Sequence, residues 1–172
     1  VAGGYSADRL GGCESLRGRR RLVWPEIPQT QIIRADMTYR FDAQNPPVDD
    51  GEITALEELL DAPLPENYKA LLKYSHGGEW PIPVAPYDFV MFEIDTVIGN
   101  LTATDFAEAF PGLLPIGGDG MSDYIALDFT GGGAAKVVGV DAVESAPEDA
   151  VYPISDTLEA FLEMVGQAPE ED

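Results

Sequence analysis

Two stretches with helical spacing of apolar residues open the ordered part of the chain. In the first, Ile53, Leu56, Leu59 and Leu60 recur with a period near 3.6 residues, which places them on one face of a helix. Acids precede this stretch at 49–50, where the positive end of a helix dipole favours negative charge. The pattern therefore predicts an amphipathic helix that begins near residue 50 and stops before Pro63.

A second helix is predicted from Pro65 onward, because proline suits the first turn of a helix, where its missing N–H would be unpaired anyway. Tyr68, Leu71, Leu72 and Ser75 fall at i, i+3, i+4 and i+7, so they form one stripe on this helix. The pair Gly77-Gly78 favours a helix end soon after this stripe. We expect His76, the only histidine, to lie at that end as a partner for the negative pole of the helix dipole.

The middle of the chain has the composition and alternation of β-strands. Residues 89–98 are rich in aromatic and β-branched side chains, which favours a strand. Residues 124–129 alternate, with Ile125, Leu127 and Phe129 on one face. The glycines of 131–133 then predict the turn of a hairpin with a strand over 135–140.

A final helix is predicted from Ser155 or Asp156, because Asp156 and Glu159 have the spacing of a capping box. Leu158, Phe161, Leu162 and Val165 supply its apolar stripe. Helices thus come first, strands fill the middle and a helix closes the chain. This order predicts an α+β fold with a mostly antiparallel sheet and helices packed on one face, two of them N-terminal and one C-terminal.

Charge divides the chain at Met37. Residues 1–36 have six arginines against four acids, whereas the rest has 27 Asp and Glu against four Lys and Arg. Such an acidic domain repels itself, which costs stability, so the acidity favours a role in solubility or in attracting a basic partner. Nucleic-acid binding is disfavoured, because phosphate contacts need clustered Lys and Arg.

We expect one domain over residues 37–172 and a separate leader over 1–36. The leader is rich in Gly, Ser and Arg without a helical or alternating period, so we interpret it as a disordered tail or as the product of a misplaced start before Met37. An arginine-rich nucleic-acid arm is the less favoured alternative. The single cysteine, Cys13, favours a reducing cytosol, and no apolar run is long enough to span a bilayer.

Chemistry-bearing patterns are weak in this sequence. One histidine and one cysteine in different segments make a zinc site unfavourable. Asp119, Asp123 and Asp128 form the best carboxylate cluster, yet their spacing does not match a calcium loop, and turn formation explains them better. The glycines of 131–133 lack the phosphate-loop pattern. We therefore expect no catalytic residue, no metal and no cofactor.

Aromatic residues among acids are the remaining candidates, since aromatic anchors surrounded by charge are typical of protein interfaces. The aromatic residues in or beside loops are Trp80, Tyr87, Tyr124 and Tyr152. For each of them, ordinary packing in the core or at its rim is the alternative. The candidate partner-binding residues are Glu79, Trp80, Tyr87, Asp88, Glu93, Asp95, Asp119, Asp123 and Tyr124.

Three ordered blocks of the sequence resemble the SUKH superfamily, the Smi/Knr-type domain, over about residues 50–166. The first joins the acidic helix at 56–60 to the LPENYKALL segment at 64–72 and the turn at 76–78. The second is the LPIGGDG segment at 114–120 with the strand after it, and the third is the closing helix at 155–165. The chain departs from the usual pattern at His76, where most members have Asn, and at Ser122.

The resemblance implies a non-enzymatic α+β domain. Bacterial members act mostly as immunity proteins that neutralise a toxin, often a nuclease, whereas a minority are regulatory scaffolds. We therefore expect a cytoplasmic, monomeric immunity protein whose partner is a basic protein toxin. The alternatives are a regulatory or scaffold module of the Smi/Knr type, and an enzyme that uses Asp119, Asp123 and Asp128 with a metal.

Overall fold

The computed structural model describes residues 39–170. The expectations for the leader, for Met37 and for Cys13 fall outside this range. The described part starts with two helices, α1 (Asp50–Leu60) and α2 (Glu66–Tyr74), and all six of its strands follow them. The elements after α2 are β1 (Gly78–Pro81), β2 (Asp88–Met91), α3 (Ile94–Thr102), α4 (Phe106–Ala109), β3 (Leu113–Gly118), β4 (Asp123–Asp128), β5 (Lys136–Asp141), α5 (Pro147–Ala150), β6 (Val151–Ser155) and α6 (Leu158–Met164).

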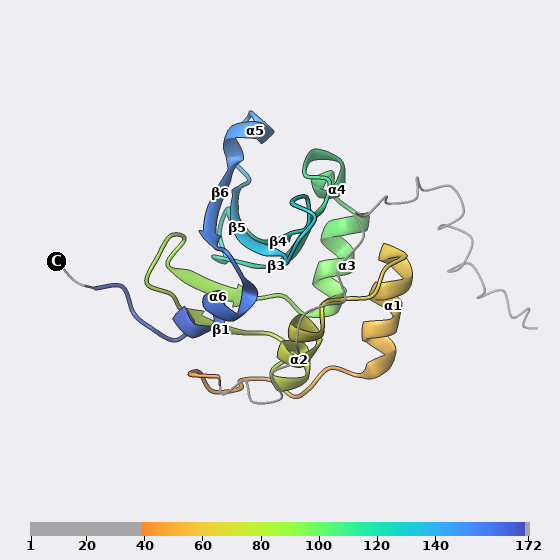
Figure 1. The fold of residues 1–172 in the computed structure, drawn as a ribbon, viewed down its shortest axis with the longest axis vertical. Coiled ribbons are helices and arrows are strands. Elements are labelled where there is room, and N and C mark those ends of the chain that lie inside the picture. The colour runs from red at the N-terminus through yellow and green to blue at the C-terminus, as the bar shows by residue number, and fades with distance from the viewer. Residues whose placement is uncertain (1–38, 171–172) are drawn as a thin grey trace, which may run out of the picture.

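The six strands form one sheet in the order β1-β2-β3-β4-β5-β6, and each neighbouring pair is antiparallel. Every strand therefore pairs with the strand that precedes or follows it in the chain. The predicted hairpin is confirmed, because β4 and β5 pair in register from Asp123 opposite Asp141 to Asp128 opposite Lys136. The α+β class with an antiparallel sheet is confirmed as well (Figure 1).

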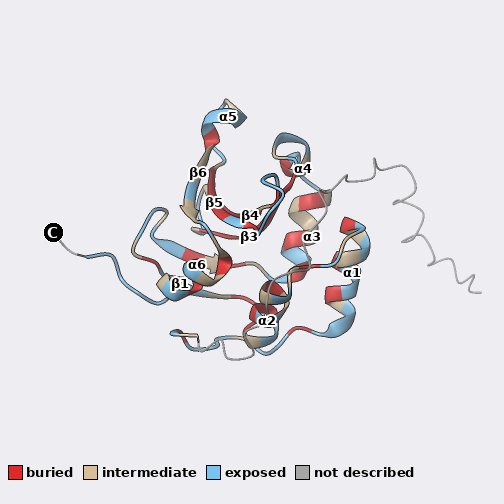
Figure 2. Ribbon diagram, in the orientation of Figure 1, coloured by how far each residue is buried: buried red, intermediate tan, exposed pale blue. Residues whose placement is uncertain are grey.

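The main core lies between the sheet and the longer helices α1, α2, α3 and α6. It includes Leu56 and Tyr68 from the helices, and Phe89, Ile125 and Leu127 from the strands. Figure 2 shows the buried positions where these helices and strands face one another. The opposite face of the sheet carries a second, smaller cluster, in which Phe106 of α4 and Ala150 of α5 cover strand residues such as Ala126.

The predicted start of α1 near residue 50 is confirmed, and a capping box fixes it. The Asp49 carboxylate accepts a hydrogen bond from the Gly51 N–H at 2.6 Å, and the Asp49 N–H donates to the Glu52 carboxylate at 3.1 Å. This capping box pairs backbone groups that a helix end otherwise leaves without partners.

The predicted strand over 89–98 is wrong in its second half. β2 ends at Met91, and α3 begins at Ile94. The physical reason is the spacing of Ile94, Val97 and Leu101, which lie on one helical face and are buried in the main core. The β-branched side chains at 96–98 favour a strand by composition, but the packing of the helical face on the core decides for a helix.

Two further local expectations need correction. His76 does not serve the end of α2: its Nε2 accepts a hydrogen bond from the Ile94 N–H at 2.9 Å, so it pairs the first backbone donor of α3. At the last helix, Thr157 is the N-cap, and its hydroxyl accepts from the Ala160 N–H at 3.1 Å. The expected start at Ser155 or Asp156 is therefore too early, since Ser155 still belongs to β6.

Candidate interaction surface

Three connections gather at one end of the sheet. Because the strands alternate in direction, the β1–β2, β3–β4 and β5–β6 connections must emerge at the same end. We call residues 82–88, 119–123 and 141–150 together the loop end; it lies on the left of Figure 1, with α5 at its upper corner. The start of α3 and the β4–β5 turn lie at the opposite end.

The β3–β4 turn is fixed by Asp119. One oxygen of its carboxylate accepts hydrogen bonds from the N–H groups of Met121 at 2.8 Å and Asp123 at 3.0 Å. Gly120 has a φ of 78°, a left-handed conformation that glycine adopts without a steric penalty. The turn therefore has a defined shape before any partner arrives.

The β3–β4 turn and the β5–α5 connection are joined to each other. Asp123 and Asp141 are paired across β4 and β5, and the next residue, Ala142, donates its N–H to the Ser122 carbonyl at 3.2 Å. The Asp141 carboxylate in turn accepts from the Val143 N–H at 2.9 Å. The two connections consequently form one continuous surface.

Tyr152 of β6 braces this surface from the edge of the sheet. Its hydroxyl donates to the Asp123 carboxylate at 2.7 Å. Its ring occupies the space above Gly139, where any Cβ would overlap it. Burial, the hydrogen bond to Asp123 and the nearby charges of Asp119 and Asp141 raise the pKa of Tyr152 above its usual value. The phenol therefore stays protonated at neutral pH and remains a donor.

Four of the predicted partner-binding residues belong to the loop end. They are Tyr87, Asp88, Asp119 and Asp123. Tyr87 is half exposed, at 53%, and has a φ of 73°, while Asp88 is exposed at the start of β2. The sequence alone does not group these four residues. The antiparallel topology brings them to one end of the sheet.

Trp80 and Tyr124 have packing roles. Trp80 is 5% exposed, its ring lies 4.7 Å from that of Phe41, and its Nε1–H donates to the Asp42 carbonyl at 3.1 Å. The Tyr124 ring lies 4.9 Å from the Phe106 ring, within the smaller cluster. The packing alternative therefore describes both aromatic residues.

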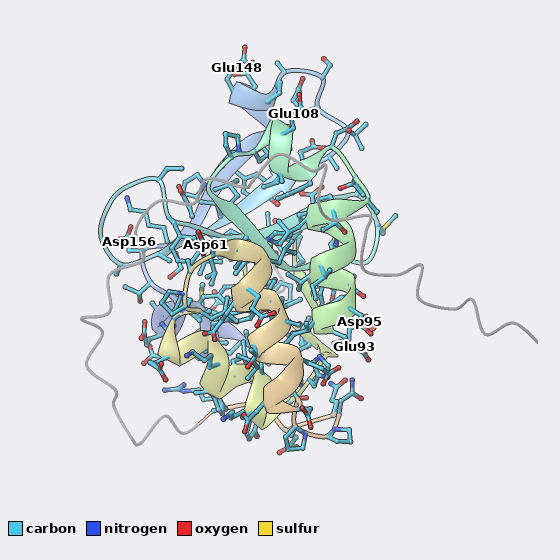
Figure 3. All side chains as sticks on the ribbon, turned by 90° about the vertical axis from the view of Figure 1, so that its right-hand side faces the viewer. Asp61, Glu93, Asp95, Glu108, Glu148 and Asp156 are labelled. Atoms are coloured by element: carbon cyan, nitrogen blue, oxygen red, sulfur yellow. The ribbon has the colours of Figure 1, made fainter. Side chains whose placement is uncertain are left out.

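Glu79, Glu93 and Asp95 lie away from the loop end. Glu79 is on the edge strand β1, where the Gln44 side chain bonds both its N–H, at 2.9 Å, and its carbonyl, at 2.5 Å. Gln44 thereby covers an edge that another strand could otherwise extend. Glu93 and Asp95 flank the start of α3 and are labelled together in Figure 3, far below Glu148 of α5. The nine predicted residues thus do not form one surface.

The carboxylates Asp119, Asp123 and Asp128 do not converge. Asp128 ends β4 at the opposite end of the strand from Asp123, and its carboxylate accepts from the Thr130 N–H at 2.8 Å. Across residues 39–170, no group of three or more His, Cys, Asp or Glu side chains has an arrangement that could hold a metal ion. Each of the three acids instead serves a turn or strand end next to it.

Comparison with known proteins adds one match. A model of the SMI1/KNR4 family (SUKH-1) matches residues 47–164, which is more than half of the chain. No curated protein matches significantly. Within residues 39–170, none of the helices has the length and apolar character that a membrane crossing would require.

Proposed function

The chain belongs to the SMI1/KNR4 (SUKH-1) family, and from this premise we propose that it is an immunity protein that binds and neutralises a basic protein toxin. The family match accounts for a protein-binding domain. The choice of a toxin as partner rests on the charge of the chain, because complementary charge accelerates association and suppresses wrong partners. We place this activity in the cytosol, where the toxin must be blocked before it acts on the cell.

The observation that carries the proposal is the loop end. Its three connections contain seven acids and no Lys or Arg, and the acids are Asp88, Asp119, Asp123, Asp141, Glu144, Glu148 and Asp149. A dense patch of one sign raises the local concentration of an oppositely charged partner and its association rate. A toxin that acts on nucleic acid presents a basic active site, which is the kind of surface that such a patch would cover.

We also propose that the chain itself catalyses no reaction. The side chains that the sequence offers as candidates for catalysis are engaged in structure: the Nε2 of His76 accepts from the Ile94 N–H, and Asp119 and Asp128 accept from the backbone of nearby turns. A nucleophile would need a base with a free nitrogen or oxygen within hydrogen-bond reach.

Co-expression tests the proposal directly. The gene should have a neighbour that encodes a protein with a basic toxin domain, and cells that express this domain should survive only when the full chain is co-expressed. The purified proteins should bind in a salt-sensitive manner. Failure of the chain both to bind the neighbouring toxin domain and to rescue growth would refute the immunity role. Binding to a basic cellular protein, without rescue, would support the regulatory scaffold in its place.

A further inference from the structure

Exposed apolar side chains are concentrated at the loop end. Within residues 39–170, the large hydrophobic residues classed as exposed are Val84, Tyr87, Met121 and Val143. All four lie in the three connections that define the loop end. Single exposed apolar residues are common on protein surfaces and need no explanation, but their confinement to one end is typical of an interaction site.

Met121 and Val143 are the most exposed of the four, at 92% and 75%. They lie in the two connections that the Ala142–Ser122 backbone hydrogen bond joins. The N–H of each is held by an aspartate of its own turn, Met121 by Asp119 and Val143 by Asp141. Because the backbone is already ordered, contact with a partner would require little further loss of conformational entropy.

The charges around these two residues define what could cover them. Asp88, Glu148 and Asp149 are exposed, and their side chains make no hydrogen bond or ion pair within the described part of the chain. The three lysines lie elsewhere: Lys69 and Lys73 on α2, and Lys136 at the start of β5, which is the opposite end of the sheet. The partner must therefore supply positive charge around an apolar centre.

We propose that the loop end is the surface that binds the basic partner protein, with Met121 and Val143 as its apolar anchors and Asp88, Glu148 and Asp149 as its steering charges. This assignment rests on the proposed function. A second copy of the chain is the wrong occupant, because a face-to-face dimer would bring two sets of seven acids together, and like charges across an interface are unfavourable. Apolar anchors at the centre and charges at the rim match the general anatomy of protein interfaces.

Four variants of the full chain separate the anchoring role of the apolar residues from the steering role of the acids. M121S/V143S removes the apolar anchors, and M121L/V143I retains their apolar character. D88N/E148Q/D149N removes three loop-end charges. Its matched control, E58Q/D95N/D156N, removes the same number and kinds of exposed acids elsewhere; Asp95 and Asp156 are labelled in Figure 3, well below Glu148. Circular dichroism and thermal unfolding of each variant establish that it folds.

The probe is the basic toxin domain encoded beside the gene, and the readout is association and dissociation by surface plasmon resonance. M121S/V143S should dissociate at least about tenfold faster, because affinity differences within one interface arise mostly in the dissociation rate. M121L/V143I should stay within about threefold of the parent chain. D88N/E148Q/D149N should associate several-fold more slowly at low salt, with a weaker salt dependence, whereas the matched control should behave as the parent.

Two results would overturn the assignment while leaving the proposed function intact. The first is tight binding of the parent chain that neither loop-end variant weakens. The second is sedimentation of the chain alone as a dimer that M121S/V143S dissociates, since the anchors would then serve a second copy. If the parent chain does not bind the toxin domain at all, the proposed function fails, and the assignment falls with it.

Discussion

In the α1–α2 pair, the Lys69 amine lies 3.1 Å from the Glu57 carboxylate and 3.0 Å from that of Glu66, and the Lys73 amine lies 2.8 Å from Asp50. At the loop end, no carboxylate has a lysine or arginine partner among the described residues. Both regions are acidic, yet only in the first do some of the acids have lysine partners. Net charge alone therefore does not locate a binding surface. The absence of lysine and arginine partners, within the described range, for the acids of the loop end is the more informative feature.

The loop end itself contains two kinds of acid. Asp119 and Asp141 hold backbone N–H groups of the turns, as Asp49 does at the start of α1. Asp88, Glu148 and Asp149 have no such role within residues 39–170. We therefore expect structural acids of both regions to affect stability and the unpartnered acids to affect only association.

The largest expected effect on stability comes from Gly139→Ala, because the new Cβ would displace the Tyr152 ring that braces the loop end. We expect the free energy of unfolding to fall by about 1–3 kcal/mol, as is typical of overpacking. Gly131→Ala is the control, since a Cβ there would meet nothing within 4 Å. Urea denaturation measures both; equal stability of the two variants would contradict the bracing role of Tyr152.

The next effect compares one structural acid with one unpartnered acid. Asp49→Ala should lower the free energy of unfolding by about 1 kcal/mol, because the α1 capping box is lost. Asp88→Ala at the loop end should change it by less than about 0.5 kcal/mol, as is usual for surface positions without such a role. A larger loss for Asp88→Ala than for Asp49→Ala, in the same denaturation experiment, would reverse the comparison.

Removal of a tyrosine hydroxyl should change the free energy of unfolding differently in the two regions. The Tyr68 hydroxyl of α2 is buried without a hydrogen-bond partner, so Tyr68→Phe should leave stability equal or raise it by up to about 1 kcal/mol. Tyr152→Phe breaks the bond to the Asp123 carboxylate and should lower stability by about 1 kcal/mol. Destabilisation by Tyr68→Phe of the same size would show that its hydroxyl has a partner.

Alkaline pH adds a second readout for Tyr68. Burial raises the pKa of Tyr68 above the value of about 10 that the unfolded chain has. A group whose pKa is raised on folding contributes its full stability below the unfolded pKa and loses it as pH rises toward the folded one. We therefore expect the parent chain to lose stability above about pH 10 more steeply than Tyr68→Phe does. Parallel curves for the two proteins would contradict this.

The smallest effect concerns the exposed pair in the helices. The hydrogen bond to Lys73, together with its charge, lowers the pKa of Asp50 below its usual value. Lys73→Met should return this pKa toward the usual value, which a carboxyl titration followed by NMR can detect, without a measurable change in thermal unfolding. An unchanged pKa for Asp50 would mean that the pair does not form in solution.

Much of the fold could be predicted because its signals are local. The start of α1, the stripe of α2 and the β4–β5 hairpin each depend on residues close together in sequence. The helix α3 was missed because the β-branched residues at 96–98 favour a strand by composition, whereas burial of Ile94, Val97 and Leu101 in the core decides for a helix. The strands β1 and β6 were missed because they are short and contain Pro81 and Pro153, so only pairing with β2 and β5 defines them.

The candidate surface was only partly predictable. Tyr87, Asp88, Asp119 and Asp123 are candidates by residue type alone, and their common location follows from the alternating strand directions. Met121 and Val143 were missed, although each is an isolated apolar residue in a polar turn. That signal becomes interpretable only when the structure shows that both side chains are exposed and that their turns are hydrogen-bonded together.

The most direct test of the loop end as the binding surface is an NMR map of the isotope-labelled full chain, recorded with and without the basic toxin domain. We expect the backbone amide shifts that change on binding to concentrate in residues 82–88, 119–123 and 141–150, while those of α1 and α2 stay in place. Changes concentrated on α1 and α2, with the loop end unaffected, would contradict the assignment.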